Sequence, residues 1–286
     1  MNEMTLPLPA KKPEWLKIHL PGGESYLEVK NIVERHKLNT ICLSGKCPNL
    51  GECWGRGTAT FMILGDICTR SCKFCATKTG KPAPVDLNEP ERIAESVKLM
   101  QLKHVVITSV DRDDLLDGGA ALWASTIREI KKTNPGTTIE ALVPDFKGSR
   151  NALQVVIEER PDIISHNLET IKRLTPAIRN KANYNTSLQV LEQIAENGVI
   201  AKSGIMVGLG ETEEEVWTLM DDLRNVGCSI LTIGQYLQPT RAHYPVHEYI
   251  NPFQFSKYKE EGLKKGFTFI ESQPLVRSSY HAEKHV

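Results

Sequence analysis

From residue 60 onward the chain alternates short apolar runs with longer amphipathic stretches. The apolar runs have strand length and cover residues 60–64, 104–110, 138–143, 163–166, 201–207 and 230–235. Most are apolar at every position rather than at alternate ones, which is typical of strands covered on both faces of a parallel sheet. Stretches with helical spacing follow them, at residues 89–101, 119–133, 149–160, 187–197, 213–225 and 252–265. The pattern predicts an α/β protein with six βα units.

Six units are too few for a closed eight-stranded barrel. A curved, partly open (β/α)6 barrel is the most economical interpretation, and a doubly wound sheet is the alternative. Either architecture places a ligand site at the carboxyl ends of the strands. We expect an N-terminal extension over residues 1–59, the barrel over residues 60–266 and a C-terminal extension over residues 267–286, which contains a further apolar run.

Six of the seven cysteines lie in two triplets between residues 42 and 75. The second triplet, Cys68, Cys72 and Cys75, has the spacing C-x3-C-x2-C, which lets a short loop bind one iron-sulfur cluster and leaves one iron open. A structural zinc site would need a fourth ligand nearby, and none follows Cys75 at zinc spacing. Cys228 stands alone in an apolar stretch, so we expect a small core residue there.

The first triplet is Cys42, Cys47 and Cys53, with the spacing C-x4-C-x5-C. It follows a predicted amphipathic helix over residues 24–38 and lies in a stretch rich in glycine and proline. Such a stretch disfavours a long helix and suits a tight metal-binding loop.

Composition and charge narrow the class of protein further. Lys plus Arg equals Asp plus Glu at 35 each, so no net charge attracts the chain to nucleic acid or to a membrane surface. No apolar run is long enough to span a membrane, and the first residues have the features of neither a signal peptide nor a transit peptide. We therefore expect a cytoplasmic protein, in which cysteines bind metal more often than they form disulfides.

Polar residues and glycines cluster where the predicted strands end. The polar ones are Thr108, Ser109, Asp111, Arg112, Asp113, Asp114, His166, Asn167, Glu169, Gln235, Tyr236 and Gln238. They could face a ligand, although Asp and Asn at such positions often only cap the next helix. Gly204, Gly208 and Gly210 would let a flat group approach the backbone closely, or would simply form a turn; they match a dinucleotide fingerprint only loosely.

The last apolar run is followed by the string RSSYHA, which contains Ser279. A serine hydroxyl is a poor iron ligand, so chemistry alone does not favour a metal role for it. Four histidines, at positions 243, 247, 281 and 285, form no pair on a clear helix, and we expect surface or packing roles for them.

Three motifs together carry a family resemblance over nearly the whole chain. CTRSCKFC resembles the defining motif of the radical S-adenosylmethionine (SAM) enzymes, and CLSGKCPNLGEC with RSSYHA resembles the lipoyl synthase family. The resemblance implies that the second triplet holds a [4Fe-4S] cluster whose free iron binds SAM. It implies that the first triplet and Ser279 hold an auxiliary [4Fe-4S] cluster. It also implies that Gly204 and Gly208 line the adenine site, with Asn167 and Glu169 near the ribose and Ser109 and Asp111 near the methionine.

The resemblance further implies a reaction and its partners. An electron from a donor such as flavodoxin or ferredoxin would lead to a 5′-deoxyadenosyl radical, because no side-chain base can remove hydrogen from an unactivated methylene. Two sulfur atoms from the auxiliary cluster would then enter at C6 and C8 of an octanoyl chain on a lysine of a lipoyl carrier domain. The expected carriers are the E2 subunits of 2-oxoacid dehydrogenases and the glycine cleavage H protein, with no nucleic-acid or membrane partner.

Three other functions remain open from the sequence. A radical SAM enzyme resembling biotin synthase would share the second triplet but not the first triplet or RSSY. A ferredoxin-like electron carrier would need far fewer residues than six βα units provide. A zinc-stabilised nucleic-acid binder would need a basic, aromatic-laced stretch, which is absent from the sequence.

Overall fold

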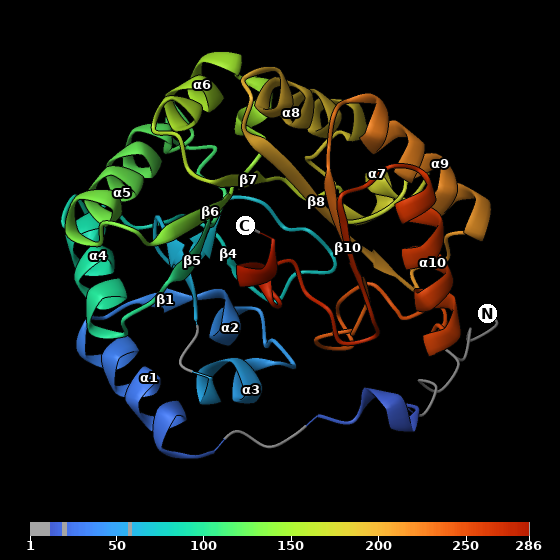
Figure 1. Cartoon of the computed structure of the whole chain (residues 1–286), viewed down its shortest axis with the longest axis horizontal. Helices are drawn as coiled ribbons and strands as arrows, with labels where there is room; N and C mark the ends of the chain where they lie inside the picture. Colours follow the sequence, from blue (N-terminus) through green and yellow to red (C-terminus); the bar gives the residue numbers. More distant parts are fainter. Residues whose placement is uncertain (1–11, 19–21, 57–58, 286) are drawn as a thin grey trace, which may run out of the picture.

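A curved, mostly parallel sheet ringed by helices forms the body of the molecule (Figure 1). The computed structural model describes residues 12–18, 22–56 and 59–285, so part of the predicted N-terminal extension lies outside the described residues. The strand order is β1-β2-β5-β6-β7-β8-β9-β10. Each new parallel strand is added at the same edge without a reversal of order. The fold is therefore a partly open barrel, and the doubly wound alternative is wrong.

The six predicted strands are confirmed, and two more extend the sheet. The predicted ones are β2 (Thr60–Ile63), β5 (His104–Ser109), β6 (Thr138–Leu142), β7 (Ile163–Ser165), β8 (Ile200–Val207) and β9 (Ile230–Gln235). β1 (Asn39–Thr40) pairs antiparallel with β2, and β10 (Phe269–Ser272) pairs parallel with β9. The apolar run that we placed beyond the barrel thus supplies a barrel strand. The division of the chain into three segments stays a prediction.

The predicted helices lie on the outer face of the sheet (Figure 1). They are α1 (Glu24–Arg35), α4 (Glu89–Leu99), α5 (Ala120–Thr133), α6 (Arg150–Glu158), α8 (Tyr184–Glu196), α9 (Glu213–Asn225) and α10 (Pro252–Lys264). Gly198 and Gly227 follow α8 and α9 with φ of +72° and +81°, as C-terminal caps require. None of the helices within the described ranges is long and apolar enough to cross a membrane.

The structure also contains short elements that the sequence pattern did not predict, three of which, α2 (Ile41–Ser44), α3 (Leu50–Gly55) and β3 (Ile67–Cys68), contain cysteines. The others are β4 (Lys78–Thr79), α7 (Thr175–Ile178) and three short 3-10 helices, η1 (Glu14–Leu16), η2 (Phe146–Gly148) and η3 (Ala282–Lys284). The first triplet therefore lies on α2, α3 and their connection rather than on a plain loop. Trp54 of α3 and Cys42 of α2 are buried with Val29 and Val33 of α1, and this second apolar cluster orders the segment.

Glu89 fixes the point where β2 leads into the second cysteine triplet. Its buried carboxylate accepts a hydrogen bond from the backbone N–H of Leu64 at 2.7 Å. Leu64 has a φ of +69°, an unfavourable value for a residue with a branched side chain. Burial raises the pKa of Glu89, and this hydrogen bond opposes the rise. The contact thus holds a strained turn directly before the cysteines.

Replacing Glu89 with alanine should destabilise the protein by about 2 kcal/mol, because the buried Leu64 N–H would lose its partner. Urea unfolding of the cluster-free protein measures this change. Glu91→Ala is the matched control, since Glu91 is exposed in the same turn of α4, and its cost should stay within about 0.5 kcal/mol. Equal costs for the two variants would contradict the role of Glu89.

Candidate iron-sulfur and cofactor site

One cavity of about 850 Å³ is lined by residues of both cysteine triplets. The first triplet approaches it from α2 and α3, and the second from the segment that follows β2. The other residues predicted at the strand ends or in the tail that lie on its wall are Thr108, Ser109, Asp111, His166, Asn167, Glu169, Gly204, Tyr236, Gln238 and Ser279. Gly208 is not among the lining residues. A Cβ at that position would strike the amide nitrogen of Gln235 and the carbonyl of Glu248, so its small size serves local packing.

Backbone hydrogen bonds of the protein itself hold the Cys68 thiol of the second triplet in place. Cys68 Sγ accepts the N–H groups of Arg70 and Asp111, both at 3.4 Å. Burial, with a contribution from the Asp111 carboxylate, raises the pKa of the Cys68 thiol to about 11. Burial likewise raises the pKa of Cys72 to about 12 and also raises that of Cys75. Cluster binding must therefore displace protons from all three thiols.

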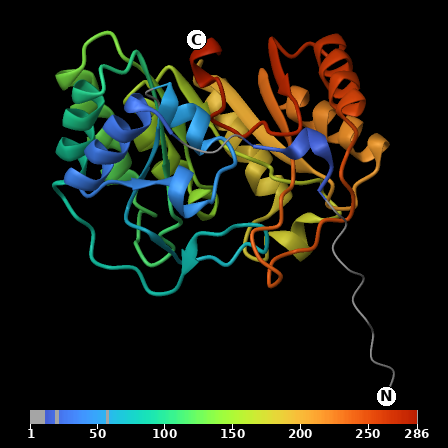
Figure 2. The ribbon, with the colours of Figure 1, turned by 90° about the horizontal axis from the view of Figure 1, so that it is seen from below.

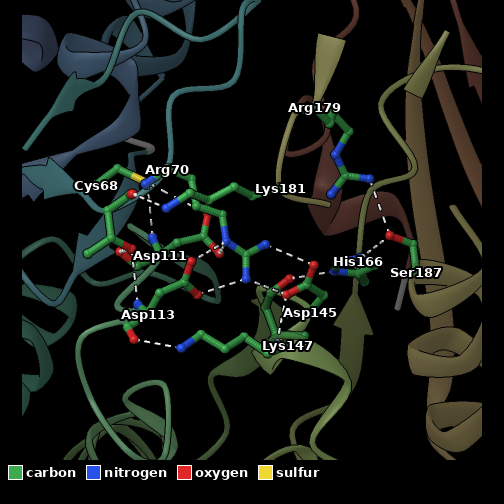
Figure 3. Close-up of polar contacts among 12 residues, drawn as sticks. Cys68, Arg70, Asp111, Asp113, Asp145, Lys147, His166, Arg179, Lys181 and Ser187 are labelled. Atoms are coloured by element: carbon green, nitrogen blue, oxygen red, sulfur yellow. Dashed lines mark hydrogen bonds and ion pairs between the residues drawn. The ribbon is translucent and has the colours of Figure 1, made fainter. Parts of the chain in front are cut away.

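Arg70 ties this cysteine loop to the ends of two barrel strands (Figure 3). Its guanidinium, 5% exposed, makes paired hydrogen bonds of 2.7–2.9 Å to Asp113 and to Asp145, which follow β5 and β6. A third carboxylate, Asp111, lies at 3.4 Å. Burial alone would raise the pKa of Asp145, but the hydrogen bonds and charge of Arg70 outweigh it and hold that pKa at about 2. Paired arginine–carboxylate contacts of this kind fix geometry as well as charge.

The first triplet shares its side of the cavity with the tail, which we define as residues 273–285. Ser279 Oγ accepts a hydrogen bond from the hydroxyl of Thr60 at 2.8 Å. The side chain of Asn49 donates to the carbonyl of Leu275 at 2.7 Å, and the Tyr280 hydroxyl donates to Glu52 at 3.0 Å. These bonds join the tail to β2 and to the segment that carries the first triplet.

The thiols of the first triplet also have raised pKa values. Burial, followed by the nearby Cys47, raises the pKa of Cys42 to about 11. Burial and the neighbouring cysteines raise the pKa of Cys53 to about 12. Burial raises that of Cys47 as well, although Arg277 opposes the rise.

Two glycines let the tail lie against the barrel strands. A Cβ on Gly234 of β9 would collide with the carbonyl of Val276. A Cβ on Gly204 of β8 would lie 2.8 Å from Asn167 Oδ1 and 3.1 Å from Ser278 Oγ. Of the three glycines at which we expected a close approach, Gly204 alone meets the protein's own tail, whereas Gly208 and Gly210 meet Gln235, Glu248 and His247.

Several polar atoms around the cavity are available for a ligand. Asn167 Nδ2 donates to Glu169 at 3.1 Å and to Ser278 at 2.6 Å, but Asn167 Oδ1 and Ser109 Oγ are buried with no hydrogen-bond partner. Burial raises the pKa of Glu169, and Arg179 opposes the rise. Unpartnered buried polar atoms are rare, and a cofactor with amino, carboxylate and hydroxyl groups would satisfy them. The cavity wall therefore fits a molecule such as SAM.

The thiols within each triplet lie close enough to raise one another's pKa values. Among the described residues, no three His, Cys, Asp or Glu side chains lie close enough together to hold a single metal ion. A four-iron cluster makes a different demand, because each protein ligand binds a different iron atom.

Some polar residues predicted to face a ligand have their partners within the protein, and of these His166 still lines the cavity whereas Gln235, Arg112 and Asp114 do not. Both ring nitrogens of His166 lie 2.9 Å from protein oxygens, those of Val143 and Ser187, and burial lowers its pKa to about 4. Gln235 bonds to backbone groups of the segment that follows β9. Arg112 pairs with Asp114. Arg70 and Arg179 were not predicted from the sequence, since nothing in its pattern indicated that these arginines would be buried beside the cavity.

Comparisons with known proteins define the class. A model of the Radical SAM superfamily matches residues 62–223, more than half of the chain. Among solved structures, *Streptococcus suis* SuiB bound to S-adenosylmethionine has a TM-score of 0.58 at 12% identity, covering 78% of this chain and 54% of that one. Methylornithine synthase (PylB) has a TM-score of 0.57 at 12% identity, with coverages of 87% and 79%. The chain belongs to the radical SAM superfamily.

Curated relatives define the family within that class. Lipoyl synthase from *Bacteroides fragilis* (strain YCH46) is 67% identical over 96% of this chain and 96% of its own length. Lipoyl synthase from *Treponema denticola* is 58% identical over 96% of this chain and 95% of its own length. This chain therefore belongs to the lipoyl synthase family. It is a radical SAM sulfur-inserting enzyme that uses SAM and a [4Fe-4S] cluster and acts on a lipoyl carrier substrate.

The charge of Asp145 should shape how the stability of the cluster-free protein depends on pH. Because its folded pKa is lowered to about 2, its charge contributes stability above its unfolded pKa of about 3.9, and this contribution is lost as the pH falls toward about 2. Between about pH 5 and about pH 2, the free energy of unfolding measured in urea should therefore fall by about 2 kcal/mol more for the unsubstituted protein than for Asp145→Asn. Parallel pH profiles would show that the Arg70 contact does not lower this pKa.

Proposed function

We propose that the chain inserts two sulfur atoms, at C6 and C8 of an octanoyl chain on a lysine of a lipoyl carrier domain, and that the sulfur comes from an auxiliary [4Fe-4S] cluster. The observation that carries the proposal is the single cavity lined by both cysteine triplets and Ser279. A hydrogen-abstracting group and a sulfur donor must reach the same methylene carbons. Sites that share one cavity meet that requirement.

Cys68, Cys72 and Cys75 would hold the SAM-binding cluster, and Cys42, Cys47 and Cys53 with Ser279 the auxiliary one. When bound, SAM and the first cluster would supply the abstraction of hydrogen from an unactivated methylene, chemistry that side chains cannot perform. The chain's own residues position the cluster ligands and enclose the cavity. Arg70 fixes the loop of the second triplet, and the Thr60 hydroxyl points at Ser279 Oγ.

The remaining polar groups would orient SAM. Asn167 Oδ1 and Ser109 Oγ have no protein partner and would bind the ribose and the methionine part, respectively, while Glu169 would assist at the ribose and Asp111 at the methionine. Gly204 would contribute to the adenine side of the wall. The corresponding role for Gly208 has no support from the geometry, because this residue packs against Gln235.

The finer identity of the partners is part of the same proposal. We propose the E2 subunits of 2-oxoacid dehydrogenases and the glycine cleavage H protein as carriers, and flavodoxin or ferredoxin as electron donor. The expected cytoplasmic location also stays a prediction. Anaerobic incubation of the reconstituted enzyme with SAM, a reductant and an octanoylated carrier peptide should give two added sulfurs and 5′-deoxyadenosine. Deoxyadenosine without sulfur insertion would contradict the proposed function.

The iron content should report two separate clusters. Anaerobically reconstituted protein should hold about eight iron atoms per chain, and replacing either cysteine triplet with alanine should leave about four, because each triplet would bind its own four-iron cluster. Cys228→Ala is the control and should keep the full iron content, since Cys228 is buried away from the cavity. A loss of all iron on removing one triplet would argue against independent sites.

Ser279→Cys should keep an auxiliary cluster yet fail to form the lipoyl group. The hypothesis behind this expectation is that the serine alkoxide can leave iron more readily than a thiolate, so that a cysteine at this position would hinder the release of sulfur from the cluster. Iron and sulfide counts measure the first effect, and mass spectrometry of the carrier peptide measures the second. Unimpaired lipoyl formation by this variant would rule out a special role for the hydroxyl.

A further inference from the structure

A buried ion pair lies inside the barrel, toward the amino ends of its strands. The Lys202 ammonium contacts both carboxylate oxygens of Glu140 at 2.7 and 2.8 Å, and the two side chains are 1% and 0% exposed. Ser165 donates to the same carboxylate at 2.9 Å. These residues come from β8, β6 and β7, whereas the second cysteine triplet follows the carboxyl end of β2. The ion pair is therefore separate from the SAM side of the site.

The tail supplies a third partner for this lysine. His285 Nδ1 lies 3.1 Å from Lys202 Nζ. An ammonium group can only donate, so Nδ1 is the acceptor and the imidazole is neutral. The His285 ring is 7% exposed, and its centroid lies 4.5 Å from that of Phe269 on β10. Ala282, in the preceding 3-10 helix, is 1% exposed.

The tail reaches this ion pair by running through the barrel. After β10 it passes Gly234 at Val276 and Gly204 at Ser278, and it ends against Lys202. Figure 1 shows its last turn at the centre of the ring of strands, and Figure 2 shows that turn on the opposite side of the molecule from the teal segment around β3 and β4. Ser279 thus lies between the glycine contacts of the tail on one side and its contact with Lys202 on the other.

We propose that His285 is a positioning residue whose hydrogen bond to Lys202 locks the tail in the barrel and so holds Ser279 at the auxiliary site; this rests on the proposed role of Ser279 as a cluster ligand. A buried ion pair contributes little net stability. Here the Lys202 ammonium of this pair provides a directional hydrogen-bond donor, and an acceptor must lie at the position of Nδ1 to bind it. The hydrogen bond to a charged group thereby fixes the register of the tail against the barrel.

The test uses three substitutions and two measurements. His285→Ala removes the acceptor, His285→Asn restores an acceptor near the position of Nδ1, and Lys284→Ala removes the exposed neighbouring side chain. Amide hydrogen exchange of residues 276–284 is measured in the full-length, cluster-free protein. Iron loss to a chelator is measured in protein whose second triplet is replaced by alanine, so that only the auxiliary cluster remains.

His285→Ala should speed both processes about tenfold, the effect expected from losing a hydrogen bond to a charged group. His285→Asn and Lys284→Ala should stay within about twofold of the parent. If amide hydrogen exchange of residues 276–284 is unchanged in His285→Ala, the hydrogen bond to Lys202 does not hold the tail, and this conclusion is independent of the role of Ser279.

Ser279→Ala separates the lock from the proposed function. If it speeds iron loss and His285→Ala accelerates only the exchange, the serine is a ligand but His285 does not position it, and the inference is overturned. If Ser279→Ala leaves iron loss unchanged, the ligand assignment itself fails, and the positioning role fails with it.

Discussion

The path of the tail along the inside of the barrel is the constraint on which the site depends. It is possible because Gly234 leaves room for the carbonyl of Val276 and Gly204 leaves room beside Ser278. With the tail in place, Ser279 is hydrogen-bonded to Thr60 on β2. A larger side chain at either glycine would displace backbone or buried polar groups, so the path of the tail requires glycine at both positions.

Buried charge organises the two ends of the barrel in different ways. At the carboxyl ends, Arg70 joins the second triplet to Asp113 and Asp145, so that this loop is held by protein contacts alone. At the amino ends, Lys202 and Glu140 neutralise each other beneath the tail. At the carboxyl ends of β5 and β7, Ser109 Oγ and Asn167 Oδ1 are left without partners, which is the arrangement expected where a polar ligand completes the site.

The sequence predicted the local features well because they depend on short-range patterns. Continuous apolar runs gave the six strands, and cysteine spacing gave the candidate ligands. The missed features depend on long-range packing. The Arg70 contacts join residues 43 and 75 positions apart, and His285 meets Lys202 across 83 positions. The run at the start of β10 was placed outside the barrel because an isolated apolar run does not reveal its partner strand. The helices α2 and α3 were not predicted because they are stabilised by packing on α1.

We propose that two differently ligated clusters face one cavity. Crystals of the anaerobically loaded enzyme, measured at the iron absorption edge, test it most directly. The account predicts two groups of anomalous iron peaks, one within bonding distance of Cys68, Cys72 and Cys75 and one within bonding distance of Cys42, Cys47, Cys53 and Ser279, both on the wall of the same cavity. A single group of peaks, or two groups in cavities separated by protein, would contradict it.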